Sequence, residues 1–197
     1  PMHARRIIIT CLWCLALGIN GHARQYTSAN PLVYEDVWDL APYAFINENG
    51  QPDGFNIDLL KLMMNRLGIP YTIKLKQSPR NFEDLENHKA DLTIGIKAFY
   101  HDKYGQYNNN ILSLFTHSVA RAKDKEAKIK TWGDLRNNKV MVHDNSFSHN
   151  MMKRDGLGDN AIPVNDMKGA LIKLNETGEG AILWNSMTMR TIISNNK

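Results

Sequence analysis

The segment from Gly50 to Gly68 constrains the fold of this chain more than any other. An Asn49-Gly50 turn leads to Gly54, and the Asn56 that follows is a good N-cap residue for a helix. Apolar residues then recur at helical spacing, which predicts a helix with one buried face: Ile57, Leu60, Met64 and Leu67. The segment is therefore predicted to be a turn that feeds directly into an amphipathic helix.

Strands are predicted on both sides of this helix. Leu32–Val37 has the pattern of a first strand, and Gly68 is suited to end the helix before an alternating strand at 71–76. Ser78-Pro79 has the pattern of a helix start, and Lys89–Ile96 that of a third strand. This order predicts a mostly parallel sheet with right-handed crossovers, and ligands collect at the strand ends of such sheets.

A change in composition divides the two halves of the chain. Residues 121–130 are strongly charged and are expected on the surface, so we place a lobe boundary near residue 118. Proline in the strand predicted at 161–164 places that strand at a sheet edge. The other elements expected here are a capping box at 131–135, strands at 139–143 and 180–185, a helix opening at 145–148, and a helix capped by Asp166.

The first 23 residues have the pattern of a secretory signal peptide. Two arginines precede an apolar run from 7 to 19 that is too short to span a membrane, and cleavage is expected near Ala23. Both cysteines lie in that run, so the mature chain is expected to have neither a disulfide nor a thiol nucleophile. A lipoprotein attached at Cys11 is the alternative, although little apolar sequence precedes it.

Composition and motifs narrow the possible functions. The chain has 197 residues, 43% of them hydrophobic, enough for the core of one domain or two small lobes. Its net charge of +4, without a basic run that carries aromatic residues, argues against a nucleic-acid partner. No P-loop, nucleophile elbow or zinc-type histidine pair occurs, so no cofactor and no metal are expected.

Two kinds of titratable residue need a separate interpretation. The five histidines of the middle of the chain are interpreted as surface residues: His88, His101, His117, His143 and His149. Asp39 and Asp58 could form an acid–base pair of an enzyme, although Asp58 stands at a helix start where a capping role is sufficient.

Three stretches, in this order and at these separations, resemble one known family. They are Gly54-Phe55-Asn56-Ile57-Asp58-Leu59 after a glycine-flanked turn, Lys89-Ala90-Asp91 leading to Tyr100-His101-Asp102-Lys103, and the run from Ile129 to Val142. Together with an aromatic residue after the first strand, they are similar to the type 2 periplasmic solute-binding proteins, family 3 of the bacterial extracellular solute-binding proteins. The resemblance covers most of residues 32–195.

The resemblance implies an α/β, two-lobed periplasmic-binding-protein-like clamshell of the Venus flytrap type. Residues 24–117 would form lobe one and residues 118–197 lobe two. In the family, further residues return from lobe two to lobe one, and here this return is expected to be truncated.

The resemblance also implies a ligand site. Lys103 stands where the family has an arginine for the ligand carboxylate, and Asn185 stands where it has an acid for the ligand ammonium. Backbone amides at the helix start 145–148 would hold an anionic group, and Tyr43 and Phe45 would cover an apolar part. The expected ligand-binding residues are Asp39, Tyr43, Phe45, Lys97, Tyr100, Lys103, Asn145, Ser146, Phe147, Ser148 and Asn185.

A neutral, anionic or larger polar solute fits these substitutions at least as well as a plain α-amino acid. The resemblance implies a periplasmic protein without catalytic activity that senses its solute for a membrane receptor such as a histidine kinase. Two alternatives stay open: a soluble binding protein that works with the permease of an ABC transporter, and a clamshell enzyme such as a dehydratase. The sequence downstream of Lys197 would separate sensor from transporter.

Overall fold

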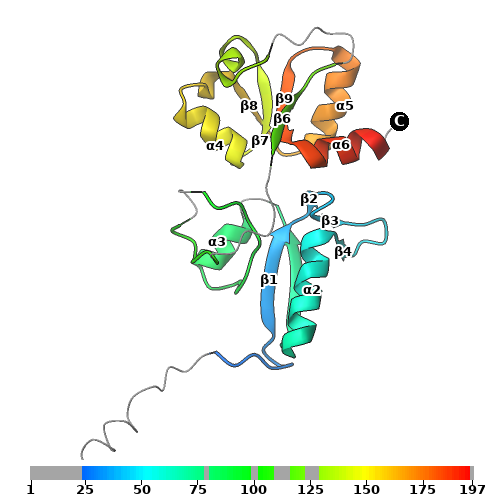
Figure 1. Cartoon of the computed structure of the whole chain (residues 1–197), viewed down its shortest axis with the longest axis vertical. Helices are drawn as coiled ribbons and strands as arrows, with labels where there is room; N and C mark the ends of the chain where they lie inside the picture. The colour runs from blue at the N-terminus through cyan, green and yellow to red at the C-terminus, as the bar shows by residue number, and fades with distance from the viewer. Residues whose placement is uncertain (1–23, 78–79, 99–101, 109–115, 123–128, 196–197) are drawn as a thin grey trace, which may run out of the picture.

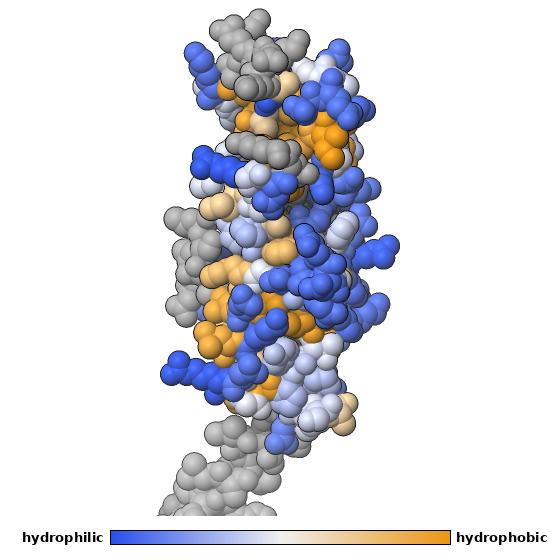
Figure 2. Space-filling model, turned by 90° about the vertical axis from the view of Figure 1, so that its right-hand side faces the viewer, coloured by the Kyte–Doolittle hydropathy of each residue, from blue (hydrophilic) through white to orange (hydrophobic). Residues whose placement is uncertain are grey.

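The computed structural model describes residues 24–77, 80–98, 102–108, 116–122 and 129–195. The predicted signal peptide with its cleavage site, and the Ser78-Pro79 helix start, lie outside the described residues. Figure 1 shows two lobes stacked along the long axis of the molecule. Figure 2 shows the same elongated shape from the side, with hydrophobic residues gathered in separate areas between hydrophilic ones.

Lobe one is built on a parallel strand pair and a helix. Strand β1 (Leu32–Val37) pairs in parallel with β5 (Tyr71–Lys76), with Leu32 opposite Tyr71. The helix α2 (Phe55–Leu67) lies between them in the chain and places its apolar face on the pair. The buried residues of this core are Leu32, Tyr34, Ala44, Ile57, Leu60 and Met64.

The start of α2 differs from the prediction. Gly54, and not Asn56, is the N-cap, and it has a φ of 114°. Gly54 is required here because a Cβ at this position would lie 2.6 Å from the carbonyl oxygen of Tyr43. Asn56 is instead the second helical residue and is buried, 4% exposed. The predicted end of the helix is confirmed, because Gly68 has the left-handed conformation with a φ of 66°.

The third strand predicted at 89–96 does not form as a continuous strand. Only one parallel bridge joins this segment to β1, between Leu92 and Tyr34. One reason lies in Asp91, whose side-chain Oδ2 accepts the N–H of Val33 at 2.9 Å in the place where a strand partner would bind. A short helix α3 (Arg80–Glu86) precedes this segment, as expected.

A small antiparallel sheet lies at the end of β1. It consists of β2 (Asp39–Leu40), β3 (Ala44–Ile46) and β4 (Pro52–Asp53) in that order. The segment after β1 thus contains a two-residue strand, which the sequence analysis does not predict, and in it Asp39 pairs opposite Phe45.

Lobe two is a four-stranded sheet in the order β6-β9-β7-β8. The strands β7, β8 and β9 are parallel to one another along this order, whereas β6 is antiparallel to β9. The predicted edge position of β8 is confirmed by this order. The elements are β6 (His117–Ala120), η2 (Trp132–Asn137), β7 (Val140–His143), α4 (Phe147–Arg154), η3 (Gly158–Asn160), β8 (Ala161–Val164), α5 (Met167–Thr177), β9 (Ala181–Asn185) and α6 (Ser186–Asn195).

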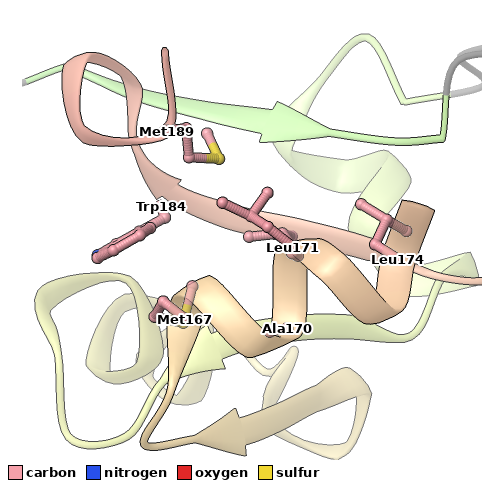
Figure 3. Close-up of a cluster of buried hydrophobic side chains, with 7 residues drawn as sticks. Met167, Ala170, Leu171, Leu174, Trp184 and Met189 are labelled. Carbon is pink, nitrogen blue, oxygen red and sulfur yellow. The ribbon is translucent and has the colours of Figure 1, made fainter. Parts of the chain in front are cut away.

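The two faces of this sheet carry separate cores because successive strand residues point to opposite sides. In β9, Ile182 and Trp184 belong to a core under α5 and α6, shown in Figure 3, whereas Leu183 belongs to the opposite core under η2 and α4. The predicted caps hold these helices in place. Asp166 Oδ1 accepts the N–H of Gly169 at 2.9 Å, and Asp134 Oδ2 accepts the N–H of Thr131 at 2.7 Å.

None of the helices in the described part of the chain combines the length and apolar character that a membrane span needs.

Candidate functional site

A pocket of about 130 Å³ lies between the two lobes. Lobe one contributes residues from the end of β1, from β2, and from α2, α3 and the segment after it. Lobe two contributes residues from β6, from the end of β7 and the start of α4, and from the end of β9. A second, apolar hollow of about 240 Å³ lies on lobe two alone, so it is not a site between lobes.

Strand ends place the polar groups of the pocket. Asp36 and Val37 end β1, His143 ends β7, and Asn185 ends β9, and all of them line the pocket. The carboxyl ends of parallel strands meet at one edge of a sheet, which is where open α/β sheets bind their ligands. The position of the pocket thus follows from the topology of both sheets.

Asp36 is held rigidly at the lobe-one side of the pocket. It is 2% exposed, and its carboxylate accepts hydrogen bonds from the hydroxyl of Tyr34, from Nδ2 of Asn56 at 2.9 Å and from the N–H of Val37 at 2.7 Å. Burial raises the pKa of Asp36 to about 6, although these hydrogen bonds lower it. Because three donors already occupy it, Asp36 shapes the pocket wall more than it offers free acceptor sites.

The start of α4 forms the lobe-two wall. Ser146 is the N-cap, and its Oγ accepts the N–H of His149 at 3.3 Å. Asn145 before it has a φ of 52°, a left-handed conformation that asparagine tolerates better than most residues. The N–H groups of Phe147 and Ser148 have no acceptor within the helix, so they and the helix dipole favour an oxygen of a ligand.

Two buried amides line the pocket from opposite lobes. Asn185 Oδ1 accepts the N–H of Thr188 at 2.9 Å, which fixes its orientation, and within the described residues its Nδ2 has no hydrogen-bond partner. Asn81 Nδ2 donates to Thr93 Oγ1 at 3.2 Å, and its Oδ1 likewise has no hydrogen-bond partner in the described part of the chain. Buried polar groups are nearly always paired, so these two amides are suited to contact a bound solute.

Three of the five histidines are not exposed, contrary to the prediction that all five are surface residues. His143 and His149 are each 5% exposed, and His117 and His143 line the pocket. His143 and His149 are buried and His117 is half-buried, because His143 ends β7, His149 lies in the first turn of α4, and His117 begins β6 at the pocket. His88 is exposed, as expected, and His101 lies outside the described residues.

His143 contacts lobe one directly. Its Nε2 lies 3.4 Å from Oδ2 of Asp39. This contact meets the distance of an ion pair but is not a well-formed hydrogen bond. Burial lowers the pKa of His143, but the carboxylates of Asp39 and Asp144 outweigh it, so that the pKa is raised above its usual value.

Six of the eleven predicted site residues line the pocket: Asp39, Asn145, Ser146, Phe147, Ser148 and Asn185. Four others do not: Tyr43, Phe45, Lys97 and Lys103. Tyr100 lies outside the described residues. The lobe-two part of the prediction thus comes together at the pocket, whereas most of the lobe-one part does not.

The two lysines point elsewhere. Both are exposed, and each lies over an aromatic ring, Lys97 over Tyr107 at 5.9 Å and Lys103 over Tyr104 at 4.5 Å. The hydrogen bond to Tyr104 raises the pKa of Lys103, so its ammonium group stays charged. Among the described lining residues no lysine or arginine occurs, and the carboxylates are Asp36 and Asp39.

Tyr43, Phe45 and Asp58 also do not line the pocket. The backbone carbonyl of Tyr43 accepts the N–H of Asn56, which makes Tyr43 part of the support of α2. Phe45 lies in β3 opposite Asp39. Asp58 is exposed on the first turn of α2, so the structure does not bring Asp39 and Asp58 together at the pocket. The described residues hold no cluster of three or more potential metal ligands.

Several pocket residues were not predicted from the sequence: Leu40, Asn56, Asn81, Phe82, His117, His143 and Trp184. His143 stands at the end of a predicted strand, where open α/β sheets bind their ligands, so this rule could have found it. Asn81 carried no such signal, because an asparagine in a short helix is ordinarily exposed.

Comparisons with known proteins identify the family. The model of the bacterial extracellular solute-binding proteins, family 3, matches residues 37–146. A histidine kinase sensor domain with similarity to periplasmic binding proteins is 23% identical, with a TM-score of 0.72, and the match covers 84% of this chain and 72% of that one.

Two solved amino-acid-binding proteins have the same fold. A Gly52Ala mutant of arginine-bound ArgBP from T. maritima is 23% identical with a TM-score of 0.74, over 86% of this chain and 79% of that one. The arginine-, lysine-, histidine-binding protein ArtJ from Geobacillus stearothermophilus is 19% identical with a TM-score of 0.71, over 84% and 71%. The comparison with curated proteins found no match. Since the family model spans more than half of the chain and the two-lobed architecture agrees, this chain belongs to the bacterial extracellular solute-binding proteins of family 3.

Proposed function

We propose that the chain binds a small dipolar solute between its lobes, outside the cytoplasm, and acts as the ligand-sensing part of a membrane receptor such as a histidine kinase. The observation that carries this proposal is the pocket itself, which takes polar groups from both lobes at the strand ends. A solute that contacts both lobes stabilises their closed arrangement, because it binds the closed state more tightly than the open one. This is the physical basis of a sensor that reports occupancy by lobe closure.

The chemistry of the wall favours a solute with both an oxygen acceptor and a nitrogen donor. The start of α4 at Phe147 and Ser148, with Nδ2 of Asn185, offers N–H groups to an oxygen. Asp39 and Oδ1 of Asn81 offer acceptors to a nitrogen on the lobe-one side. Because no described lining residue is a lysine or arginine, this wall favours a neutral, zwitterionic or cationic solute over a purely anionic one.

The sensor role is the more specific part of the proposal, and it is supported by the similarity to the histidine kinase sensor domain. The likeness to ArgBP and ArtJ supports a soluble transport protein by the same binding physics. The native gene separates these two roles. A membrane-spanning helix and kinase motifs after Lys197 support the sensor, and a soluble domain followed by a stop codon contradicts it.

The solute is tested by a thermal-shift screen of amino acids, their amides and dicarboxylates, with calorimetry on every solute that stabilises the protein. The expected result is at least one dipolar or cationic hit whose binding weakens on Phe147→Ala. Loss of an apolar wall of this size costs about 1.5–3 kcal/mol, or roughly ten- to a hundredfold in affinity. Phe55→Ala is the matched control, because Phe55 is 49% exposed and does not line the pocket.

Two results would contradict the proposal. One is a screen in which only dicarboxylates stabilise the protein. The other is a hit whose affinity is equal in Phe147→Ala and in the wild type, because its site would then lie outside the pocket.

A further inference from the structure

One narrow contact crosses from lobe one to lobe two at strand β2. Its first residue, Asp39, lies 3.4 Å from His143 Nε2 at the end of β7. Its second residue, Leu40, packs against the core formed by α5, α6 and β9 of lobe two. Neighbouring residues of one short strand thus make a charged and an apolar contact with the opposite lobe, at the pocket.

We propose that Asp39 and His143 form a latch between the lobes that tightens when His143 is protonated, so that lobe closure is favoured in mildly acidic medium. The latch needs only the two lobes and no particular solute. It therefore goes beyond the proposed binding function and stands or falls independently of it.

The geometry makes this pair sensitive to a proton. His143 is 5% exposed, and the side chain of Asp39 is 21% exposed, so water screens their attraction less than it screens a surface pair. With a neutral imidazole the contact is a weak one at 3.4 Å, whereas a protonated imidazole places a positive charge against the carboxylate.

Several other titratable groups lie near His143 or on the elements around it. Asp144, the next residue, also raises the pKa of His143 but moves with lobe two in either arrangement. Burial lowers the pKa of His117 on the pocket wall and of His149 on α4, and Nδ1 of His149 already accepts the N–H of Asn145 at 3.1 Å. Asp36 lines the same pocket from lobe one. The remaining charged residues of α4 and α5 are exposed: Lys153, Arg154, Lys168, Lys173 and Glu176.

The direction of the pH effect follows from linkage. In this structure, where Asp39 contacts His143, the pKa of His143 is raised, and separation of the lobes would take Asp39 away from it. A group with a raised pKa in one state stabilises that state fully below its ordinary pKa, about 6.5 for histidine, and loses the effect as the pH rises through the raised value. Closure should therefore weaken as the pH rises above about 6.5.

Small-angle X-ray scattering of the solute-free protein from about pH 5.5 to about pH 8.5 tests the latch. The radius of gyration of the wild type is expected to rise with pH as the lobes separate. In Asp39→Asn and in His143→Gln it is expected to stay at the high-pH value throughout. His88→Asn is the matched control, because His88 is exposed in a turn and should leave the wild-type curve unchanged.

Nuclear magnetic resonance titration of the His143 ring gives a second readout. Its pKa is expected to fall in Asp39→Asn, and circular dichroism confirms that each variant is folded. A radius of gyration that does not change with pH in the wild type would overturn the proposal. So would an Asp39→Asn variant that keeps the full pH response, or one in which the pKa of His143 is unchanged.

Discussion

Nδ2 of Asn56, in the first turn of α2, donates a hydrogen bond of 2.9 Å to Oδ2 of Asp36 at the end of β1. Both residues are buried, and both line the pocket. This bond joins the helix to the strand end at the place where the pocket is built. Asn56, which the sequence predicts as a helix cap, therefore links helix α2 to strand β1 instead.

Replacing Asn56 should lower the stability of the folded protein. Asn56→Ala removes one of the three donors to the buried carboxylate of Asp36, and we expect the free energy of unfolding to fall by about 1–3 kcal/mol. Urea denaturation measures the change. The control is Asn65→Ala, an exposed residue on the same helix, which should change the value by less than about 0.5 kcal/mol. Equal effects of the two variants would contradict the assigned role of Asn56.

Replacing Gly54, the residue before α2, should destabilise the folded protein. In Gly54→Ala, strain at a φ of 114° costs about 1–3 kcal/mol, and the overlap with the carbonyl oxygen of Tyr43 adds to it. Gly50→Ala is the control, because Gly50 also has a positive φ, 72°, but has nothing within 4 Å of its added Cβ. We expect Gly54→Ala to be clearly less stable than Gly50→Ala in urea denaturation. If Gly50→Ala costs as much, the close approach to Tyr43 is not the reason for the glycine.

Tyr34→Phe should cost more stability at neutral than at acidic pH. The hydroxyl of Tyr34 donates to Asp36, whose pKa burial raises to about 6, and its removal should raise that pKa further. A carboxyl group with a raised pKa stabilises the folded state fully below its unfolded pKa of about 3.9, and the effect is lost as the pH rises through the folded value. The cost of Tyr34→Phe should therefore grow as the pH rises past about 6.

Urea denaturation at about pH 5 and about pH 7.5 measures this difference. A carbon-detected titration of Asp36 in the wild type and in Tyr34→Phe gives the pKa directly. The same cost at both pH values, with an unshifted Asp36, would show that the hydroxyl of Tyr34 does not support the charged carboxylate.

Local sequence patterns predicted the secondary structure well where an element's conformation depends mainly on residues close to it in the sequence. The strands β1, β5, β7 and β8, the left-handed end of α2 at Gly68 and the cap of α5 by Asp166 are all confirmed. Periodicity and capping depend on neighbours in the sequence, so they can be read without the fold.

Most predicted residues that line the pocket lie on the lobe-two side, and among the described residues Asp39 is the one correct prediction on the lobe-one side. Asn145–Ser148 form one contiguous helix start, and a contiguous segment keeps its members together in any fold. On the lobe-one side, Lys103 and Tyr43 were placed by family position, and the structure turns Lys103 toward Tyr104 and uses the backbone of Tyr43 to support α2. A side-chain direction of this kind depends on contacts that the sequence does not show.

Short-range spacing in the sequence was enough to predict most of the strands and helices, the family, and the helix start that forms one wall of the pocket. The contact between Asp39 and His143, and the position of Asn81 and Asn185 in one pocket, follow from the packing of the two lobes. The members of each of these two pairs are 104 positions apart in the chain. Their approach is set by how the two sheets place their strand ends against each other, and no local propensity records that arrangement.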